Sequence, residues 1–157
     1  MVAMNRAFVK ESDQDNGALP ERAIGPHPNQ VTARGLARLD SRVRELDAER
    51  SAARAASDTA ALGRVARDLR YYQSRRESAK LVTPPAPAQQ VRFGVRALLR
   101  LPDGTERALR LVGEDEADPK AGLLSYVSPL AVAMMGKEIG AQLPFGEHTA
   151  EIVALES

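Results

Sequence analysis

The stretch VGEDEADPKAGLLSYVSPLAVAMMGK, residues 112–137, sets the architecture of the second half of the chain. After an acidic run comes an apolar segment, residues 123–127, that predicts a short strand. Ser128 and Pro129 predict a helix start, because a serine side chain caps free backbone N–H groups and proline suits the first helical position. The apolar run at residues 130–135 continues that helix for about a turn and a half.

Strands are predicted on both sides of this stretch. Residues 91–97 alternate apolar side chains with arginine and glycine, and residues 108–112 follow a Pro-Asp-Gly turn at residues 102–104. A last strand is predicted at residues 149–155. Together these segments predict a small antiparallel sheet packed on one short helix, within residues 91–157.

The segment before residue 82 has a helical period instead. Two series of residues recur at alternating steps of three and four, so each forms one face of a helix. Thr32 and Asp58 predict the N-caps of the two helices, with a turn at Ser57 and Asp58. Two arms of about 24 residues make an antiparallel helical hairpin that projects roughly 36 Å. The series are Leu36, Leu39, Val43, Leu46, Arg50 and Ala53, then Leu62, Val65, Leu69, Tyr72, Arg76 and Ala79.

The sequence thus predicts an α+β protein in four parts. A flexible N-terminal arm, residues 1–30, buries too little apolar surface to offset its ordering entropy. The coiled-coil hairpin occupies residues 31–82, and a proline-rich linker, residues 83–90, stops its second helix. The sheet domain occupies residues 91–157.

Composition excludes several chemical classes before any site is considered. The 157 residues contain no cysteine, which excludes a disulfide scaffold, a thiolate metal site and a cysteine nucleophile. The two histidines, His27 and His148, support neither a histidine metal site nor a Ser/His/Asp triad. No run of about 18 apolar residues and no secretory signal occurs, so we expect a cytoplasmic protein without a membrane partner.

The formal net charge of +1 conceals an uneven distribution. Residues 1–31 carry 3 basic and 4 acidic groups, residues 32–82 carry 12 and 7, and residues 83–157 carry 7 and 10. The hairpin is therefore basic, with a charge of +5, and the sheet domain acidic, with a charge of −3. This difference indicates two modules, of which the basic one suits an acidic partner or a nucleic acid.

Residues 112–137 resemble the C-terminal domain signature of the bacterial transcript cleavage factors GreA and GreB. The start of the hairpin, TARGL at residues 32–36, resembles more loosely the T-x-x-G start of the family's coiled coil. The resemblance covers about residues 30–157 and implies an FKBP-like fold for the C-terminal domain. The matching residues are VGEDEAD at 112–118, LLSYVSPLA at 123–131, and Gly136 with Lys137.

The resemblance implies RNA polymerase as the partner. In this family the C-terminal domain grips the rim of the polymerase secondary channel, while the hairpin enters the channel and reaches the active centre. An acidic loop beside a capped helix end suits basic polymerase helices. Without the family, the loop would be interpreted as a solvated turn and the Ser-Pro pair as a helix cap. The implied polymerase-binding residues are Asp115, Glu116, Asp118, Ser125, Ser128 and Pro129.

The hairpin tip departs from the family pattern. Cleavage factors carry D-x-x-E there, and the two carboxylates help to hold a second magnesium ion in the polymerase site. Asp58 matches the first acid and is the expected catalytic tip residue, but Ala61 takes the place of the second. The coil is also shorter than that of the family by about a dozen residues, or roughly 9 Å per arm.

Four arginines flank the tip. They suit contact with nascent RNA, DNA or the channel wall, and they suit equally a solvated helix surface. We expect no metal or cofactor of the chain's own, since magnesium would enter only within the polymerase complex. The four residues are Arg50, Arg54, Arg64 and Arg67.

The expected function is that of a monomeric elongation factor that acts on the polymerase active site rather than carrying its own, with weak or absent transcript cleavage. A first alternative is a competitor of other channel factors, similar to the Rnk branch, the regulator of nucleoside diphosphate kinase. A prolyl isomerase would need an aromatic-lined pocket from Phe93, Tyr126 and Phe145. A coiled-coil adaptor without a polymerase role is the third alternative.

Overall fold

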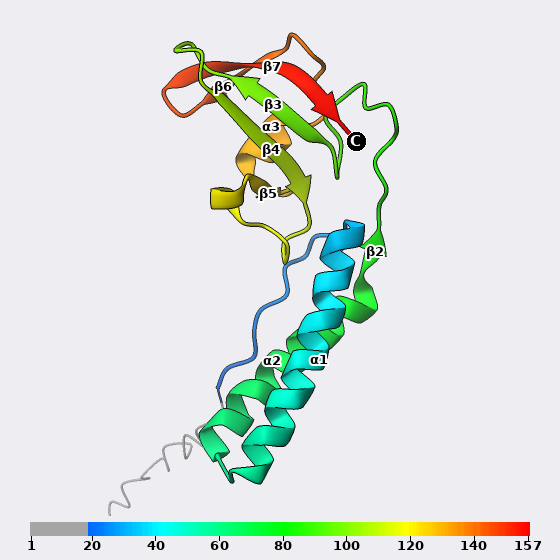
Figure 1. Ribbon diagram of the computed structural model, residues 1–157, viewed down its shortest axis with the longest axis vertical. Helices are drawn as coiled ribbons and strands as arrows, with labels where there is room; N and C mark the ends of the chain where they lie inside the picture. The colour runs from blue at the N-terminus through cyan, green and yellow to red at the C-terminus, as the bar shows by residue number, and fades with distance from the viewer. Residues whose placement is uncertain (1–18) are drawn as a thin grey trace, which may run out of the picture.

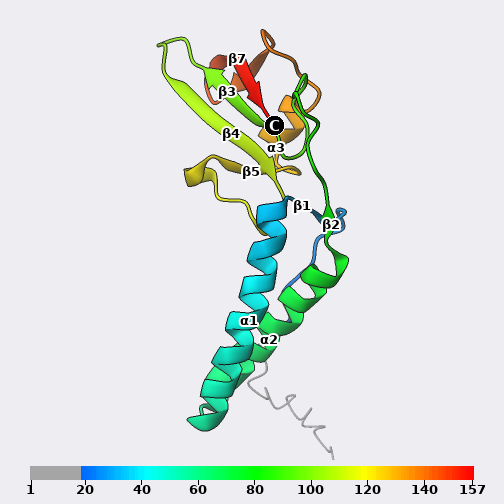
Figure 2. The same ribbon diagram turned by 45° about the vertical axis from the view of Figure 1, so that its right-hand side comes forward.

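The structure, a computed structural model, describes residues 19–157. A helical hairpin projects from one end of a small sheet domain (Figure 1). Turning the molecule by 45° shows the same separation, with the hairpin base against the loops below β4 and β5 (Figure 2). The α+β class and the order of hairpin, linker and sheet domain are as expected from the sequence.

The hairpin consists of α1 (Ala33–Ala55) and α2 (Thr59–Ser78). The Thr32 hydroxyl oxygen caps α1 by accepting from the Gly35 N–H at 2.9 Å. Asp58 caps α2 through its Oδ1 atom, which accepts from the Ala61 N–H at 2.9 Å. Both caps and the turn between them are confirmed, and Ser57 takes the left-handed φ of 52° that closes the turn.

Packing between the two helices is uneven along their length. Leu46, Val65 and Leu69 form a buried cluster, against which Val43 and Tyr72 pack. Toward the tip, Ala53 is the one buried residue of α1 beyond Leu46, because the alanines there are too small to interdigitate. Hydrophobic stabilisation of the hairpin is therefore concentrated in its middle and base.

The hairpin base is closed by a short parallel pair that the sequence did not indicate. Strand β1 (Gln30–Val31) lies beside β2 (Lys80–Leu81), in register Gln30 to Lys80. Two residues per strand are too few for a hydrophobic period to show. This pair joins the segment that enters α1 to the segment that leaves α2, so backbone hydrogen bonds link the two helices at the base of the hairpin.

The sheet domain contains five strands in the order β5-β4-β3-β7-β6. Its core residues from the sheet and α3 include Leu99, Leu111, Met134, Leu143 and Ile152, all at most 2% exposed. Helix α3 lies against one face of the sheet (Figure 1). The elements are β3 (Arg96–Arg100), β4 (Glu106–Val112), the 3-10 turn η1 (Pro119–Ala121), β5 (Leu123–Ser125), α3 (Pro129–Met134), β6 (Gln142–Phe145) and β7 (His148–Glu156).

Three details of the predicted sheet are wrong. The first strand starts at Arg96 rather than at residue 91, because Gly94 has a φ of +84° and the chain turns there. The sheet is mixed rather than antiparallel, since β5 runs parallel to β4. Strand β6 was missed, because it is a four-residue edge strand that contains Pro144.

Part of the predicted flexible arm, residues 1–30, packs on the hairpin. The Arg22 guanidinium lies 3.9 Å from the ring centre of Tyr71, and Glu21 pairs with Arg70 at 2.5 Å. Described residues of this segment therefore follow α2 instead of leaving it, and residues 1–18 lie outside the described part of the chain. Within residues 19–157, no helix combines the length and the apolar character needed to cross a membrane.

Candidate functional site

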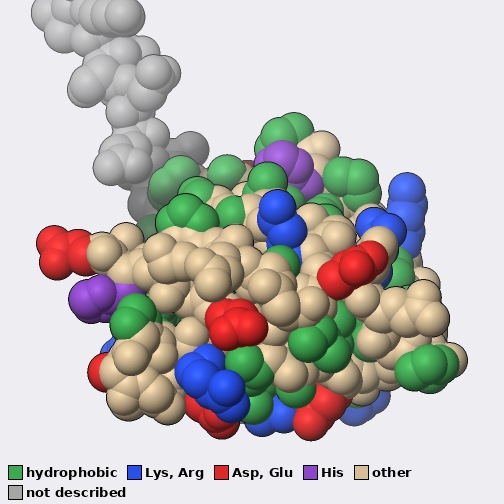
Figure 3. All heavy atoms as spheres, turned by 90° about the horizontal axis from the view of Figure 1, so that it is seen from above, with side chains coloured by type: hydrophobic (Ala, Val, Ile, Leu, Met, Phe, Trp, Pro, Cys, Tyr) green, Lys and Arg blue, Asp and Glu red, His purple; other side chains and the backbone are tan. Residues whose placement is uncertain are grey.

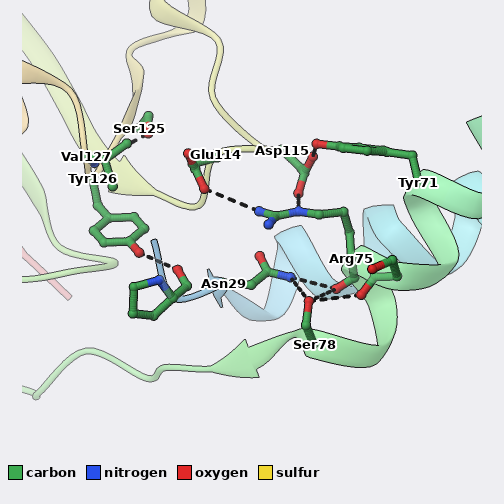
Figure 4. A network of polar contacts seen from close by, with 11 residues as sticks. Asn29, Tyr71, Arg75, Ser78, Glu114, Asp115, Ser125, Tyr126 and Val127 are labelled. Atoms are coloured by element: carbon green, nitrogen blue, oxygen red, sulfur yellow. Dashed lines mark hydrogen bonds and ion pairs between the residues drawn. The ribbon is translucent and has the colours of Figure 1, made fainter. Parts of the chain in front are cut away.

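The acidic loop, residues 114–118, faces the base of the hairpin (Figure 4). Asp115 lies between two side chains of α2, and its carboxylate accepts from the Tyr71 hydroxyl at 2.6 Å and from Arg75 Nε at 2.5 Å. Glu114 Oε2 stands 3.5 Å from Arg75 Nη2. Since the Arg75 side chain is only 3% exposed, these carboxylates neutralise a guanidinium that water scarcely reaches.

Glu116 contacts the other helix. Its carboxylate accepts from the Thr32 hydroxyl at 2.5 Å, and Arg34 Nε lies 4.0 Å away. A Cβ atom on Gly35 would stand 2.7 Å from Glu116 Oε2, so only glycine leaves room for this carboxylate. Thr32 and Gly35 are the threonine and the glycine of the T-x-x-G pattern, and both lie against Glu116 of the acidic loop.

Two tyrosines act as hydrogen-bond donors at the same junction. Burial, and then the hydrogen bond to Asp115, raise the pKa of Tyr71 to about 12. Burial, and then the negative charge of Glu114, raise the pKa of Tyr126, whose hydroxyl donates to the carbonyl oxygen of Pro28. Both hydroxyls therefore keep their protons at neutral pH and hold these contacts.

The six predicted polymerase-binding residues do not form one surface. Asp115 and Glu116 point into the chain, and Glu116 is only 4% exposed. Asp118 and Pro129 are exposed, whereas Ser125 and Ser128 are partly buried. The Ser128 hydroxyl oxygen caps α3 as expected, accepting from the Ala131 N–H at 3.4 Å. A polymerase contact remains a prediction for all six, and the two inward-facing acids already have partners within the chain.

The surface of the sheet domain away from the hairpin carries charges of both signs. Figure 3, the view from above, shows acidic and basic side chains interspersed on that face. The net acidity expected for residues 83–157 is therefore not gathered into one patch there. The acids that do cluster are those of the loop that faces the hairpin.

The hairpin tip, residues 55–61, holds one carboxylate. Asp58 is exposed, and one of its oxygens is engaged as the α2 cap. Ala61 lies one turn into the helix without a donor atom. Among residues 19–157, no group of three histidine or acidic side chains lies close enough to hold a metal ion.

The tip arginines divide into two pairs. Arg50 bonds to Asp47 at 2.8 Å and Arg67 to Asp68 at 3.0 Å, so these charges are partly neutralised. Arg54 and Arg64 are exposed and have no ion pair among the described residues. Contact with nucleic acid remains a prediction for all four, and Arg54 and Arg64 are the better placed.

The sequence pointed to Arg76, rather than Arg75, as the member of the α2 series that faces its neighbours. In the structure Arg75 is 2% exposed, whereas Arg76 is exposed and pairs with Asp40 of α1. Near the end of α2 the buried position is therefore one residue earlier than the helical period predicts. The reason is that α2 packs there on the acidic loop as well as on α1. The contact of Tyr71 with the acidic loop was not predicted for the same reason. The acidic residues 114–116 were the one sequence signal that a basic or hydroxyl side chain of the hairpin could pair with this loop.

Comparison with known proteins agrees with this architecture. Residues 86–157 match the family model described as "Transcription elongation factor, GreA/GreB, C-term". The transcription elongation factor GreB of Pseudomonas aeruginosa is 33% identical over 149 residues, covering 80% of this chain and 89% of that protein. GreB of Xanthomonas axonopodis pv. citri is 38% identical over 101 residues, 60% of each chain.

A solved structure, the prokaryotic transcription elongation factor GreA/GreB from Nitrosomonas europaea, superposes with a TM-score of 0.43. It is 18% identical, and the match covers 82% of this chain and 98% of that one. A superposition this loose supports no further argument. The match to the Pseudomonas protein spans both the hairpin and the sheet domain, and on that basis the chain belongs to the GreA/GreB family of transcription elongation factors.

Proposed function

We propose that this protein binds RNA polymerase through its sheet domain and inserts the hairpin into the secondary channel. The observation that carries the proposal is the membership of the GreA/GreB family together with a hairpin that projects from the sheet domain as a separate arm (Figure 1). The 23 residues of α1 give this arm a length of about 34 Å. Its capped turn is the far end and would arrive first at the channel floor.

Occupation of the channel, rather than efficient cleavage, is the role that the tip supports. Two carboxylates are needed to hold a second magnesium ion beside the one that the polymerase binds. The tip offers Asp58 alone, and one of its oxygens already accepts the Ala61 N–H. We therefore favour a factor that competes with other channel-binding proteins, as in the Rnk-like alternative, and acts on the polymerase without an active site of its own.

A prolyl isomerase gains no support from the sheet domain. Phe93 and Tyr126 do pack edge to face at 5.5 Å. However, Pro84 and Pro85 of the chain's own linker line the groove beside these rings. A peptide substrate would meet this linker at the aromatic pair.

Binding and cleavage are tested separately. The full chain is first immobilised and mixed with core RNA polymerase, and retention of the polymerase is expected. Stalled elongation complexes are then incubated with the wild type, with Asp58→Asn and with Ala61→Glu. Asparagine caps a helix about as well as aspartate, so Asp58→Asn removes the charge and keeps the turn.

Little cleavage is expected from the wild type and from Asp58→Asn, and more from Ala61→Glu, which restores the second acid. Failure of the wild type to retain polymerase would contradict the whole proposal. Strong cleavage by the wild type that persists in Asp58→Asn would contradict only the assignment of the tip.

A further inference from the structure

We propose that a clasp between the acidic loop and the hairpin base fixes the direction in which the hairpin leaves the sheet domain, with Arg75 as the positioning residue. The clasp consists of Thr32, Tyr71 and Arg75 of the hairpin and Asp115 and Glu116 of the loop. The role of the clasp in polymerase binding rests on the proposed function, whereas the clasp itself can be tested in the free protein.

Neighbouring loop residues grip different helices. Asp115 binds Tyr71 and Arg75, which lie in the last turns of α2. Glu116 binds Thr32, the cap of α1. Because one contact is made to α2 and the other to the cap of α1, a tilt of the hairpin that keeps one contact stretches the other. Two consecutive residues thereby oppose tilting in both directions.

Burial makes the clasp costly to open. The Arg75 side chain is 3% exposed and that of Asp115 is 12% exposed. Arg75 Nη2 has no hydrogen-bond partner within residues 19–157 and only the ion pair with Glu114, at 3.5 Å. If Asp115 withdrew, the guanidinium would lose its principal neutralising group while still shielded from water. A buried charge that loses its partner is strongly destabilising, so the closed arrangement is favoured.

Residues 29 and 30, which precede α1, also hold the base of the hairpin. Asn29 Nδ2 donates to the carbonyl oxygen of Arg75 at 2.6 Å and to the Ser78 hydroxyl at 3.1 Å. Gly113, which precedes the acidic loop, passes so close to the Gln30 carbonyl that a Cβ atom would overlap it. Figure 4 shows that Asn29 and Asp115 reach Arg75 from different segments of the chain. Arg75 is therefore fixed at its backbone as well as at its guanidinium.

A fixed direction has a consequence for partner binding. The acids Asp115 and Glu116 are engaged with the hairpin, which leaves Asp118 and Pro129 as the exposed members of the predicted contact set. A partner that docks on these residues would encounter a hairpin whose direction is already fixed. Because the hairpin is ordered before association, binding does not have to supply the free energy of ordering it.

The direction can be measured in the free protein, because the chain has no cysteine of its own. Spin labels are attached through Ala56→Cys at the tip and Glu147→Cys in the turn between β6 and β7, both exposed. Double electron–electron resonance then gives the distribution of tip-to-sheet distances. The clasp predicts one narrow peak, and Arg75→Ala should widen it at least about twofold, since the charge that orders the junction is lost.

Arg76→Ala is the matched control. Arg76 is the next residue, is exposed, and pairs with Asp40 inside the hairpin rather than with the loop. The control should leave the peak unchanged, while circular dichroism shows helix content retained in both variants. If Arg75→Ala does not fold, Asp115→Asn tests the same contact from the loop side and should also widen the peak. An unchanged width in folded Arg75→Ala or Asp115→Asn, or equal widening by Arg76→Ala, would overturn the clasp.

A second measurement separates the clasp from the proposed function. Unlabelled wild type, Arg75→Ala and Arg76→Ala are titrated against core polymerase, and Arg75→Ala should bind about tenfold more weakly than the other two, since it must order its hairpin on binding. Widening without weaker binding would overturn the inferred role in partner binding and leave the clasp in place. No binding by the wild type would count against the proposed function alone.

Discussion

The two ends of the hairpin use the same residue types for different purposes. At the base, the partly buried Asp115 pairs with the buried Arg75, and its carboxylate binds two side chains of α2. At the tip, Asp58 is exposed and binds one backbone N–H of its own helix. The base thus resembles a domain interior that holds a paired charge, whereas the tip is a solvated turn between alanine-rich segments. The comparison shows that the buried polar contacts of the arm are concentrated where it joins the sheet domain.

The largest expected difference between the two ends comes from removing an arginine. Arg75→Ala leaves Asp115 and Glu114 without their buried cation and should lower the free energy of unfolding by about 3 kcal/mol. Arg64→Ala, near the tip, removes an exposed charge and should change it by less than about 0.5 kcal/mol. Urea unfolding followed by circular dichroism measures both. Equal losses would show that the base is no more tightly held than the tip.

Adding one methyl group to each helix should have opposite effects. Gly35→Ala puts a Cβ atom 2.7 Å from Glu116 Oε2 and should cost about 1–3 kcal/mol of unfolding free energy through overpacking. Gly63→Ala in α2 meets nothing within 4 Å and should stabilise the protein by about 0.5–1 kcal/mol, because alanine favours the helix. Thermal unfolding of the pair distinguishes the effects, and stabilisation by both substitutions would exclude close packing of Glu116 on Gly35.

A smaller effect is expected at the tip cap. Asp58→Ala removes the acceptor for the Ala61 N–H and should cost about 1 kcal/mol, whereas Asp58→Asn keeps an acceptor and should be nearly neutral. Hydrogen exchange of the first-turn amides of α2 reports the loss locally. If the two variants exchange alike, the charge of Asp58 and not its capping bond stabilises the turn.

The last prediction concerns Tyr71 and is observed only at high pH. Its pKa is raised from 10.0 to about 12 in the folded protein, so its contribution to stability is complete below pH 10 and is lost as the pH rises toward 12. Tyrosinate absorbance should therefore show a titration near pH 12 that is absent in Tyr71→Phe. In that variant the loss of stability between pH 10 and 12 should also be smaller. A Tyr71 that titrates near pH 10 would mean that the bond to Asp115 is not made.

Local signals predicted much of the hairpin and the caps. Thr32, Asp58 and Ser128 were identified because a cap depends on a side chain and on the backbone within three residues of it. The start of β3 was misplaced, because alternation in residues 91–95 reflects burial beside a turn as well as it reflects a strand. The acidic loop was found as a motif, but its direction was not, because Thr32 and Glu116 are 84 residues apart.

The sequence by itself determined the local features of the hairpin and of the loop that contacts it. These are a helical period with two caps, a T-x-x-G start, a tip with a single acid, and an acidic triplet. Those properties follow from neighbours along the chain, or from composition, and need no knowledge of distant contacts. Only the tertiary structure decided that the acidic triplet faces inward and that Arg75, rather than Arg76, is the buried arginine. The reason is that a charge is buried only where an opposite charge meets it, and that meeting depends on how the sheet domain sits on the hairpin.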